Sequence, residues 1–221
     1  MSVAAVLGIL APAAAGSAFA SEQVLSGTTV PIVVVVAERV ANPPASMQPS
    51  VAFDRYCFGP GRVARCNAAA LADINLARRG EHVAPLRLPK GFAARSVPAQ
   101  ILTITNLERS ARHLKTMPLN GTLAALALAG ARRSADPSGP SGYAWGSNLA
   151  SGYDTPLAAD FGWMYDDGPG SPNSACSSAG QAGCWAHRHN IVVPWGGAQG
   201  TAGYVGAHHT EQLTQLFVEN Y

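Results

Sequence analysis

The chain has 221 residues, of which 48% are hydrophobic and 13% are charged, and its formal net charge at pH 7 is +2. This length and apolar content suffice for one sizeable core and leave too little chain for a second full domain. The sparse charge excludes a basic face that would hold a nucleic-acid backbone or an anionic membrane surface. Nucleic acid is therefore not an expected partner.

The first twenty residues form an apolar stretch that ends in Ala18-Phe19-Ala20, the small-x-small pattern that signal peptidase recognises. We expect residues 1–20 to be a signal peptide and the mature chain to be secreted or extracytoplasmic. No Lys or Arg precedes the apolar run, so either translation starts further upstream or the export signal is atypical. No later apolar stretch approaches the roughly 20 residues that a membrane span needs, so the mature chain is expected to have no transmembrane segment.

The four cysteines fall into two close pairs, Cys57 with Cys66 and Cys176 with Cys184. In an oxidising compartment this spacing predicts two local disulfides. A structural zinc site is the competing interpretation. It is disfavoured because the pairs lack the short C-x-x-C type of spacing and lie far apart in the sequence.

Residues 21–66 are predicted to be an N-terminal arm that contains an edge strand and the first disulfide loop. The edge strand is expected at 28–36, where β-branched residues dominate and Pro31 cannot donate a ladder hydrogen bond. The proline-rich stretch 42–49 is expected to be a linker.

Four helices are predicted in the middle of the chain from apolar residues at helical spacing. Capping residues place their starts at Asn67, Ser96, Asn120 and Thr155, and the first helix is expected to end at Gly80. Two short strands, at 203–207 and 213–218, are expected to close the sequence. Helices in the middle with strands towards the ends predict an α+β fold class, and a doubly wound parallel sheet is disfavoured.

Two features of the second predicted helix concern its packing. Glu108 and Arg112 are four residues apart and are expected to form an outward-facing ion pair. The spacing of Asn106 and Arg109 also echoes an Asn and an Arg in the preceding helix, at 75 and 78. Because only this one pair of segments supports a duplication, the favoured interpretation is two unrelated amphipathic helices.

Several short segments after Pro98 occur in a distinctive order. They are Asn106-Leu107-Glu108-Arg109, Pro118-Leu119 before an Ala-rich helix, Gly146-Ser147-Asn148-Leu149-Ala150-Ser151-Gly152, a helix that carries Trp163, His187-Arg188-His189-Asn190-Ile191-Val192 and Thr214-Gln215-Leu216-Phe217. This order resembles the bacterial SCP-like domain of the cysteine-rich secretory, antigen 5 and pathogenesis-related (CAP) superfamily. The resemblance implies a three-layer α/β/α sandwich of the CAP type over residues 67–221, with an irregular N-terminal extension.

Many members of that superfamily hold two His and two acidic residues in a cleft that can bind a divalent metal. Here the resemblance maps one of these to His187, whereas Ser147 stands where a Glu is expected and the second His has no counterpart. Asp166 or Asp167 could supply the second acid. The resemblance therefore implies a degraded His/Glu tetrad. The implied cleft comprises His187, Ser147, Asn148, Asp166 and Trp163.

Other matched residues are expected to have structural roles. Asn148, between two glycines, suits a tight turn with a positive φ. Arg188 and Asn190 are expected to bind an irregular segment through side-chain to backbone hydrogen bonds, and Asn106 and Arg109 of the matched helix are also expected to be structural.

These observations favour an exported CAP-like binding or interaction module of the cell envelope or extracellular space. An envelope lipid or glycan is the expected partner, with no catalytic residue, resident metal or cofactor. The alternative is a metal-dependent hydrolase or metal-binding domain that uses His187 and Asp166. A purely structural, wall-associated protein is a third possibility, and the oligomeric state is not predicted.

Overall fold

The computed structural model of the protein describes residues 40–59, 61–172, 176–206 and 211–221. The predicted signal peptide and the strand predicted at 28–36 lie outside these residues. Within the described ranges, no helix combines the length and the apolar character needed to cross a membrane.

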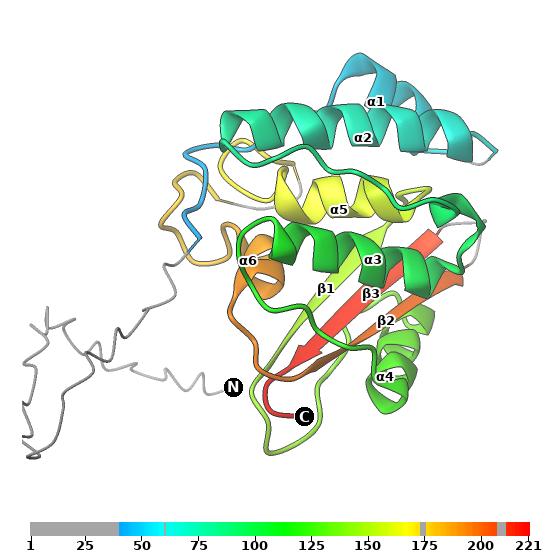
Figure 1. Ribbon diagram of the computed structural model, residues 1–221, viewed down its shortest axis with the longest axis vertical. Helices are drawn as coiled ribbons and strands as arrows, with labels where there is room; N and C mark the ends of the chain where they lie inside the picture. Colours follow the sequence, from blue (N-terminus) through cyan, green and yellow to red (C-terminus); the bar gives the residue numbers. More distant parts are fainter. Residues whose placement is uncertain (1–39, 60, 173–175, 207–210) are drawn as a thin grey trace, which may run out of the picture. The chain divides into compact units, whose positions relative to one another are not determined.

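A three-stranded antiparallel sheet lies between two groups of helices (Figure 1). The strands are β1 (Trp145–Ser151), β2 (Ala198–Val205) and β3 (Glu211–Val218), in the order β1-β3-β2. The helices are α1 (Val51–Cys57), α2 (Val63–Gly80), α3 (Val97–Ser110), α4 (Gly121–Arg132), α5 (Pro156–Met164) and α6 (Ala186–Val192), and a short 3-10 helix spans Phe92–Ala94. The predicted mixed α+β class is confirmed.

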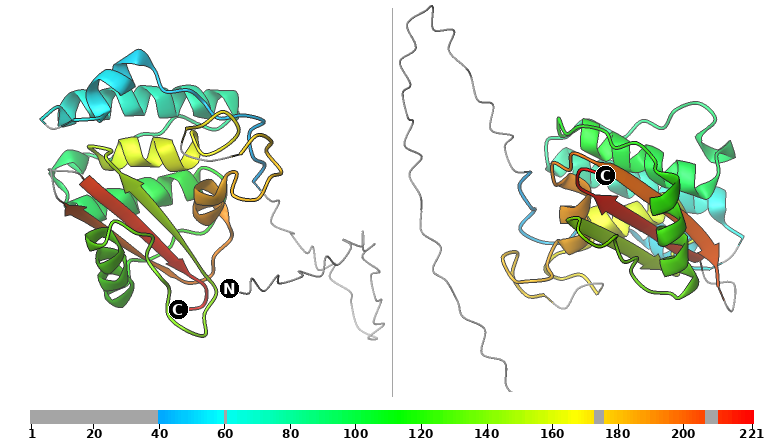
Figure 2. Two further views of the ribbon diagram at one scale, coloured as in Figure 1. Left: turned by 180° about the vertical axis from the view of Figure 1, so that it is seen from behind. Right: turned by 90° about the horizontal axis from the view of Figure 1, so that it is seen from below.

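The central strand β3 is buried on both faces, and its alternating side chains divide the core in two. Leu213 and Phe217 pack into the larger core, whereas Leu216 and Val218 pack with Leu123 of α4. Helix α4 thus covers one face of the sheet, and α3, α5 and α6 contact the other (Figures 1 and 2). Helices α1 and α2 pack together, and α2 lies against α5.

Three of the four predicted helix starts coincide with the observed ones. Asn120 accepts hydrogen bonds from the first backbone N–H groups of α4, and Thr155 accepts one from Ala158 in α5. Ser96 precedes α3, which carries Pro98 in its first turn. Helix α2 differs, because it begins at Val63, before Asn67.

The part of the predicted arm within residues 40–66 is more regular than expected. Ser50 caps α1 through a hydrogen bond from Phe53 N, and the Phe53 ring packs 4.8 Å from that of Phe161 in α5. Cys57 and Cys66 lie at disulfide distance and are fully buried between α1 and α2. The predicted boundary at residues 66 and 67 therefore falls inside α2.

The echo between α2 and α3 corresponds to equivalent side-chain bonding at the two helix ends. Asn75 exchanges side-chain hydrogen bonds with the backbone N–H and carbonyl of Leu86. Asn106 does the same with Met117. In each case the asparagine ties the helix to the strand-like segment that follows it.

The arginines and histidines of the two segments also correspond. Arg78 and Arg109 each donate Nε–H to a carbonyl six residues further on, at 2.7 and 2.8 Å. His82 and His113 both adopt left-handed φ angles, 58° and 59°, immediately after the helices end. The two helices thus end in structurally equivalent motifs.

The predicted exposure of the Glu108–Arg112 pair is wrong. Both side chains are buried, at 0% and 3% exposure, and they are bonded to each other. Glu108 also pairs with Arg78 at 2.7 Å and accepts a hydrogen bond from Tyr165 Oη at 3.0 Å. This face of α3 is covered by α5 and by the end of α2, which a pattern of polar residues alone does not reveal.

Candidate functional site

Asp167 holds the start of helix α6 and the imidazole of His187 at once. Its Oδ2 accepts the backbone N–H groups of His187 and Arg188 at 2.8 and 3.3 Å. Its Oδ1 lies 2.6 Å from His187 Nδ1. Because one carboxylate fixes both the backbone and the ring of His187, the orientation of the imidazole is set by the fold.

The pairing with Asp167 also favours the protonated form of His187. Burial lowers the pKa of the imidazole, but the hydrogen bond and negative charge of Asp167, with a smaller contribution from Asp136, outweigh burial and raise the pKa above its ordinary value. Nε2 makes no hydrogen bond to the described residues. This nitrogen is therefore free to act as a donor when the ring is protonated.

His187 lines a cavity of about 250 Å³ at the β1 edge of the sheet. The other lining residues are Leu149, Ala150, Ser151, Tyr153, Gly162 and Trp163. Trp163 is fixed by a 3.1 Å hydrogen bond from Nε1 to the carbonyl of Leu149. A Cβ at Gly162 would lie only 2.8 Å from the hydroxyl of Tyr153, so the absence of a side chain lets this ring approach α5 closely.

Two of the five residues of the implied cleft, His187 and Trp163, line this cavity. Asn148 does not line it and is fully buried, with Nδ2 donating to the carbonyl of His187 and to Gln215 Oε1. Ser147 contributes its backbone carbonyl, which accepts a 2.8 Å hydrogen bond from Asn190 Nδ2. Asn148 and Ser147 thus hold β1 against α6 without lining the cavity.

The expected positive-φ turn around Asn148 is wrong, because this residue is extended in β1 and pairs with Gln215 of β3. Gly146, two residues earlier, is needed for packing and not for a turn. A Cβ at Gly146 would lie 2.3 Å from Asn190 Oδ1. Gly146 is thus required by the close approach of α6 to the strand.

Asp166 does not line the His187 cavity, and the carboxylate that bonds to the imidazole is that of its neighbour Asp167. The Asp166 carboxyl is buried, and this burial raises its pKa to about 6; hydrogen bonding to Ser171 lowers it, while Asp167 and Asp54 of α1 raise it. The backbone carbonyl of Asp166 accepts a hydrogen bond from Ser171 Oγ. Of the two adjacent acids left open by the sequence, Asp167 is the one that contacts His187.

His189, two residues along α6, is exposed and does not line the cavity. The helical backbone directs these two side chains differently, since residues two apart do not share a helix face. Among the described residues, no three His, Cys, Asp or Glu side chains are placed to hold one metal ion.

Two buried arginines brace the elements around the cavity. Arg109 donates to the carbonyls of Ile191 and Val193, which ties α3 to the end of α6. Arg188 donates to the carbonyl of Met164 and forms two bonds to Glu81, at 2.9 and 2.8 Å. These bonds fix α6 to its neighbours, so the two side chains position His187 without lining the cavity.

The sequence did not identify Ser151, Tyr153 and Gly162 as residues of the cavity. Ser151 and Tyr153 could be found by following β1 to its end, because the strand terminates at the cavity. Gly162 carries no recognisable signal, since its role depends on the distant Tyr153 hydroxyl.

Comparison of the chain with family models, with curated proteins and with solved structures finds no match.

Proposed function

We propose that the protein is an exported CAP-like binding module that holds one sugar ring of an envelope glycan in the His187 cavity. The order of the matched segments supports this kinship. The placement of the sheet between α4 and the group α3, α5 and α6 also supports it, because a three-layer α/β/α sandwich would have helices on both faces of its sheet. The two cysteine pairs at disulfide distance fit an oxidising, extracytoplasmic compartment.

The observation that carries the proposal is the imidazole held by Asp167 at the wall of a small aromatic cavity. A sugar ring presents apolar C–H faces and hydroxyl groups together. Trp163 and Tyr153, at 3% and 9% exposure, contribute aromatic lining. His187 Nε2 and the Ser151 hydroxyl, which also accepts a hydrogen bond from Gln212, are the polar partners. Few polar anchors in a largely apolar concavity are typical of small-molecule sites.

The cavity size favours a sugar over a lipid as its occupant. At about 250 Å³ the cavity is below the roughly 300 to 1,000 Å³ of pockets that enclose drug-sized ligands. It therefore suits a single ring of a longer chain, with the remaining units outside. The alternative of a metal-dependent hydrolase that uses His187 and Asp166 has no supporting observation among the described residues.

The test is titration of the protein with the tetramer of N-acetylglucosamine, followed by native mass spectrometry. His187→Ala should weaken binding about tenfold, the equivalent of one charge-assisted hydrogen bond. His189→Ala is the matched control, because it makes the same change on the same helix outside the cavity. Equal affinities of the two variants, or no binding by the intact protein, would reject this role for the cavity.

A further inference from the structure

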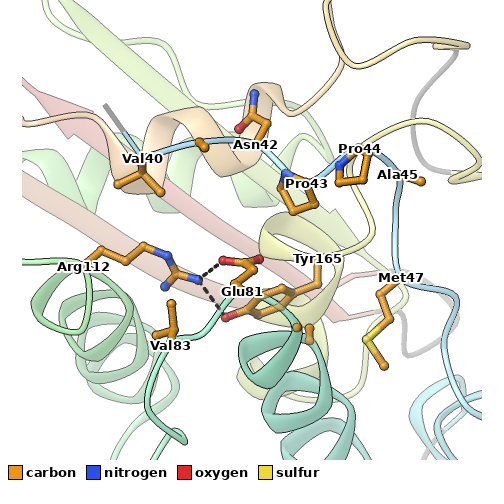
Figure 3. A pocket seen from close by; sticks show the side chains of 13 residues that line it. Val40, Asn42, Pro43, Pro44, Ala45, Met47, Glu81, Val83, Arg112 and Tyr165 are labelled. Carbon is orange, nitrogen blue, oxygen red and sulfur yellow. Dashed lines mark hydrogen bonds and ion pairs between the residues drawn. The ribbon is translucent and has the colours of Figure 1, made fainter. Parts of the chain in front are cut away.

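A second cavity, of about 500 Å³, lies at the ends of α2 and α3 and does not involve His187 (Figure 3). One wall is the segment 40–47. The opposite wall is formed by the end of α2, Val83 and Arg112, with Tyr165 between them. This volume is within the range of pockets that enclose drug-sized ligands.

The cavity wall is mainly apolar and is held in place by backbone hydrogen bonds. Its apolar lining consists of Val40, Ala41, Pro43, Pro44, Ala45, Met47, Ala77 and Val83. Met47 N donates to the carbonyl of Tyr165 at 2.8 Å, and Ser46 N donates to Pro169 at 2.9 Å. The two prolines further restrict the backbone of the wall. The cavity is therefore largely preformed.

One end of the cavity is polar. Arg112 Nη2 lies 2.8 Å from Glu81 Oε2 and 3.3 Å from Tyr165 Oη, as the dashed lines in Figure 3 show. Arg188 contacts the same carboxylate from behind. Arg112 and Arg78 also pair with the buried Glu108.

The ion pairs of this network involve more guanidinium groups than carboxylates. Three guanidinium groups, of Arg78, Arg112 and Arg188, face two carboxylates, of Glu81 and Glu108. Asp160 interacts electrostatically with the same three arginines, which lower its pKa, but burial outweighs them and raises this pKa well above its ordinary value; neither of its carboxyl oxygens has a hydrogen-bond partner among the described residues.

Besides Arg78 Nη1 and Arg188 Nε, one donor at the cavity wall is buried without a hydrogen-bond acceptor among the described residues. Arg112 Nε is buried without an acceptor in the described part of the chain, although the other nitrogens of this guanidinium are bonded. A buried donor without an acceptor is unfavourable in a folded protein. An anionic group at this end of the cavity would supply the acceptor.

We propose that this second cavity binds a small amphiphilic anion, with its apolar body against Pro43, Met47 and Val83 and its anionic group at Arg112. A carboxylate or sulfonate on a compact apolar body has the required chemistry. This site is independent of the His187 cavity and of the function proposed for it.

Two dyes that differ only in one sulfonate test the charge preference. They are 8-anilinonaphthalene-1-sulfonate and its neutral analogue N-phenyl-1-naphthylamine, and their affinities are measured by calorimetry. The sulfonate should bind at least fivefold more tightly, with one site per chain. A smaller difference would overturn the proposal.

Substitutions test whether the sulfonate dye binds in this second cavity. Val83→Trp fills the cavity and should weaken sulfonate binding at least tenfold, whereas Val63→Trp, an equal change at an exposed position of α2, should leave it unaltered. Glu81→Gln removes one negative charge and should strengthen sulfonate binding several-fold with no gain for the neutral dye. His187→Ala should have no effect. Unchanged binding by Val83→Trp, or weakened sulfonate binding by Glu81→Gln, would contradict the assignment.

Discussion

The carboxylate of Asp167 contacts His187 twice: Oδ1 lies 2.6 Å from the ring nitrogen Nδ1, and Oδ2 accepts the backbone N–H of His187 at 2.8 Å. This double contact links the fold of α6 to the chemistry of the cavity, because the carboxylate that binds the first turn of the helix also raises the pKa of the imidazole. The first prediction follows from it.

Asp167→Asn is expected to lower the pKa of His187 towards or below that of an ordinary histidine. The amide keeps the size of the side chain but removes the charge that offsets burial. Because the folded-state pKa is raised in the wild type, the pair stabilises the fold fully below pH 6.5, and this contribution is lost as the pH rises through the raised pKa. Imidazole resonances followed by NMR against pH measure the change. An unshifted His187 titration would show that Asp167 does not control it.

Asp166→Asn should flatten the dependence of stability on pH. The folded-state pKa of Asp166, about 6, is above its ordinary value of 3.8, so the native state retains this proton. The associated stabilisation is present at low pH and is lost as the pH rises through about 6. Melting temperatures between pH 4 and pH 8 should therefore fall less for the variant than for the wild type, with other titrating groups common to both. Parallel curves would contradict this.

Glu108→Ala should destabilise the fold by about 3 to 5 kcal/mol, because it leaves Arg78 and Arg112 as buried charges without their shared partner. Urea unfolding measures the loss. Asp54→Ala, at an exposed position of α1, is the control and should change stability by less than about 0.5 kcal/mol. A loss below 1 kcal/mol for Glu108→Ala would mean that the network is not buried as described.

The two disulfides should differ in their accessibility to reductants. Cys57 and Cys66 are fully buried, whereas Cys176 and Cys184 are half-buried in a surface loop. Mild treatment of the native protein with a thiol should therefore reduce the second pair first. Alkylation followed by peptide mass spectrometry identifies the order. Earlier release of Cys57 and Cys66 would contradict the packing of α1 on α2.

Local signals predicted much of the helical framework. Asn120 and Thr155 cap their helices as the sequence indicates, because a capping side chain bonds only to backbone two or three residues away. The strand β1 escaped prediction for the opposite reason. Gly146 and Asn148 suggest a turn locally, and only pairing with β3 and contact with α6 make this segment extended.

The candidate site could be predicted in part. His187 and Trp163 were identified through their resemblance to a family pattern, and they do line one cavity. The choice between Asp166 and Asp167 could not be made, since it depends on how the chain turns after α5. The charged network around Glu108 was likewise assigned to the surface, because its burial results from packing between three helices far apart in the sequence.

The most direct measurement of the central claim is the response of the six histidines to the tetramer of N-acetylglucosamine, observed by NMR of the imidazole groups. The account predicts that the His187 resonances shift progressively to saturation while those of His189 remain unmoved. A shift at His189 with none at His187, or no shift at any histidine at millimolar ligand, would contradict the assignment of the His187 cavity as the binding site.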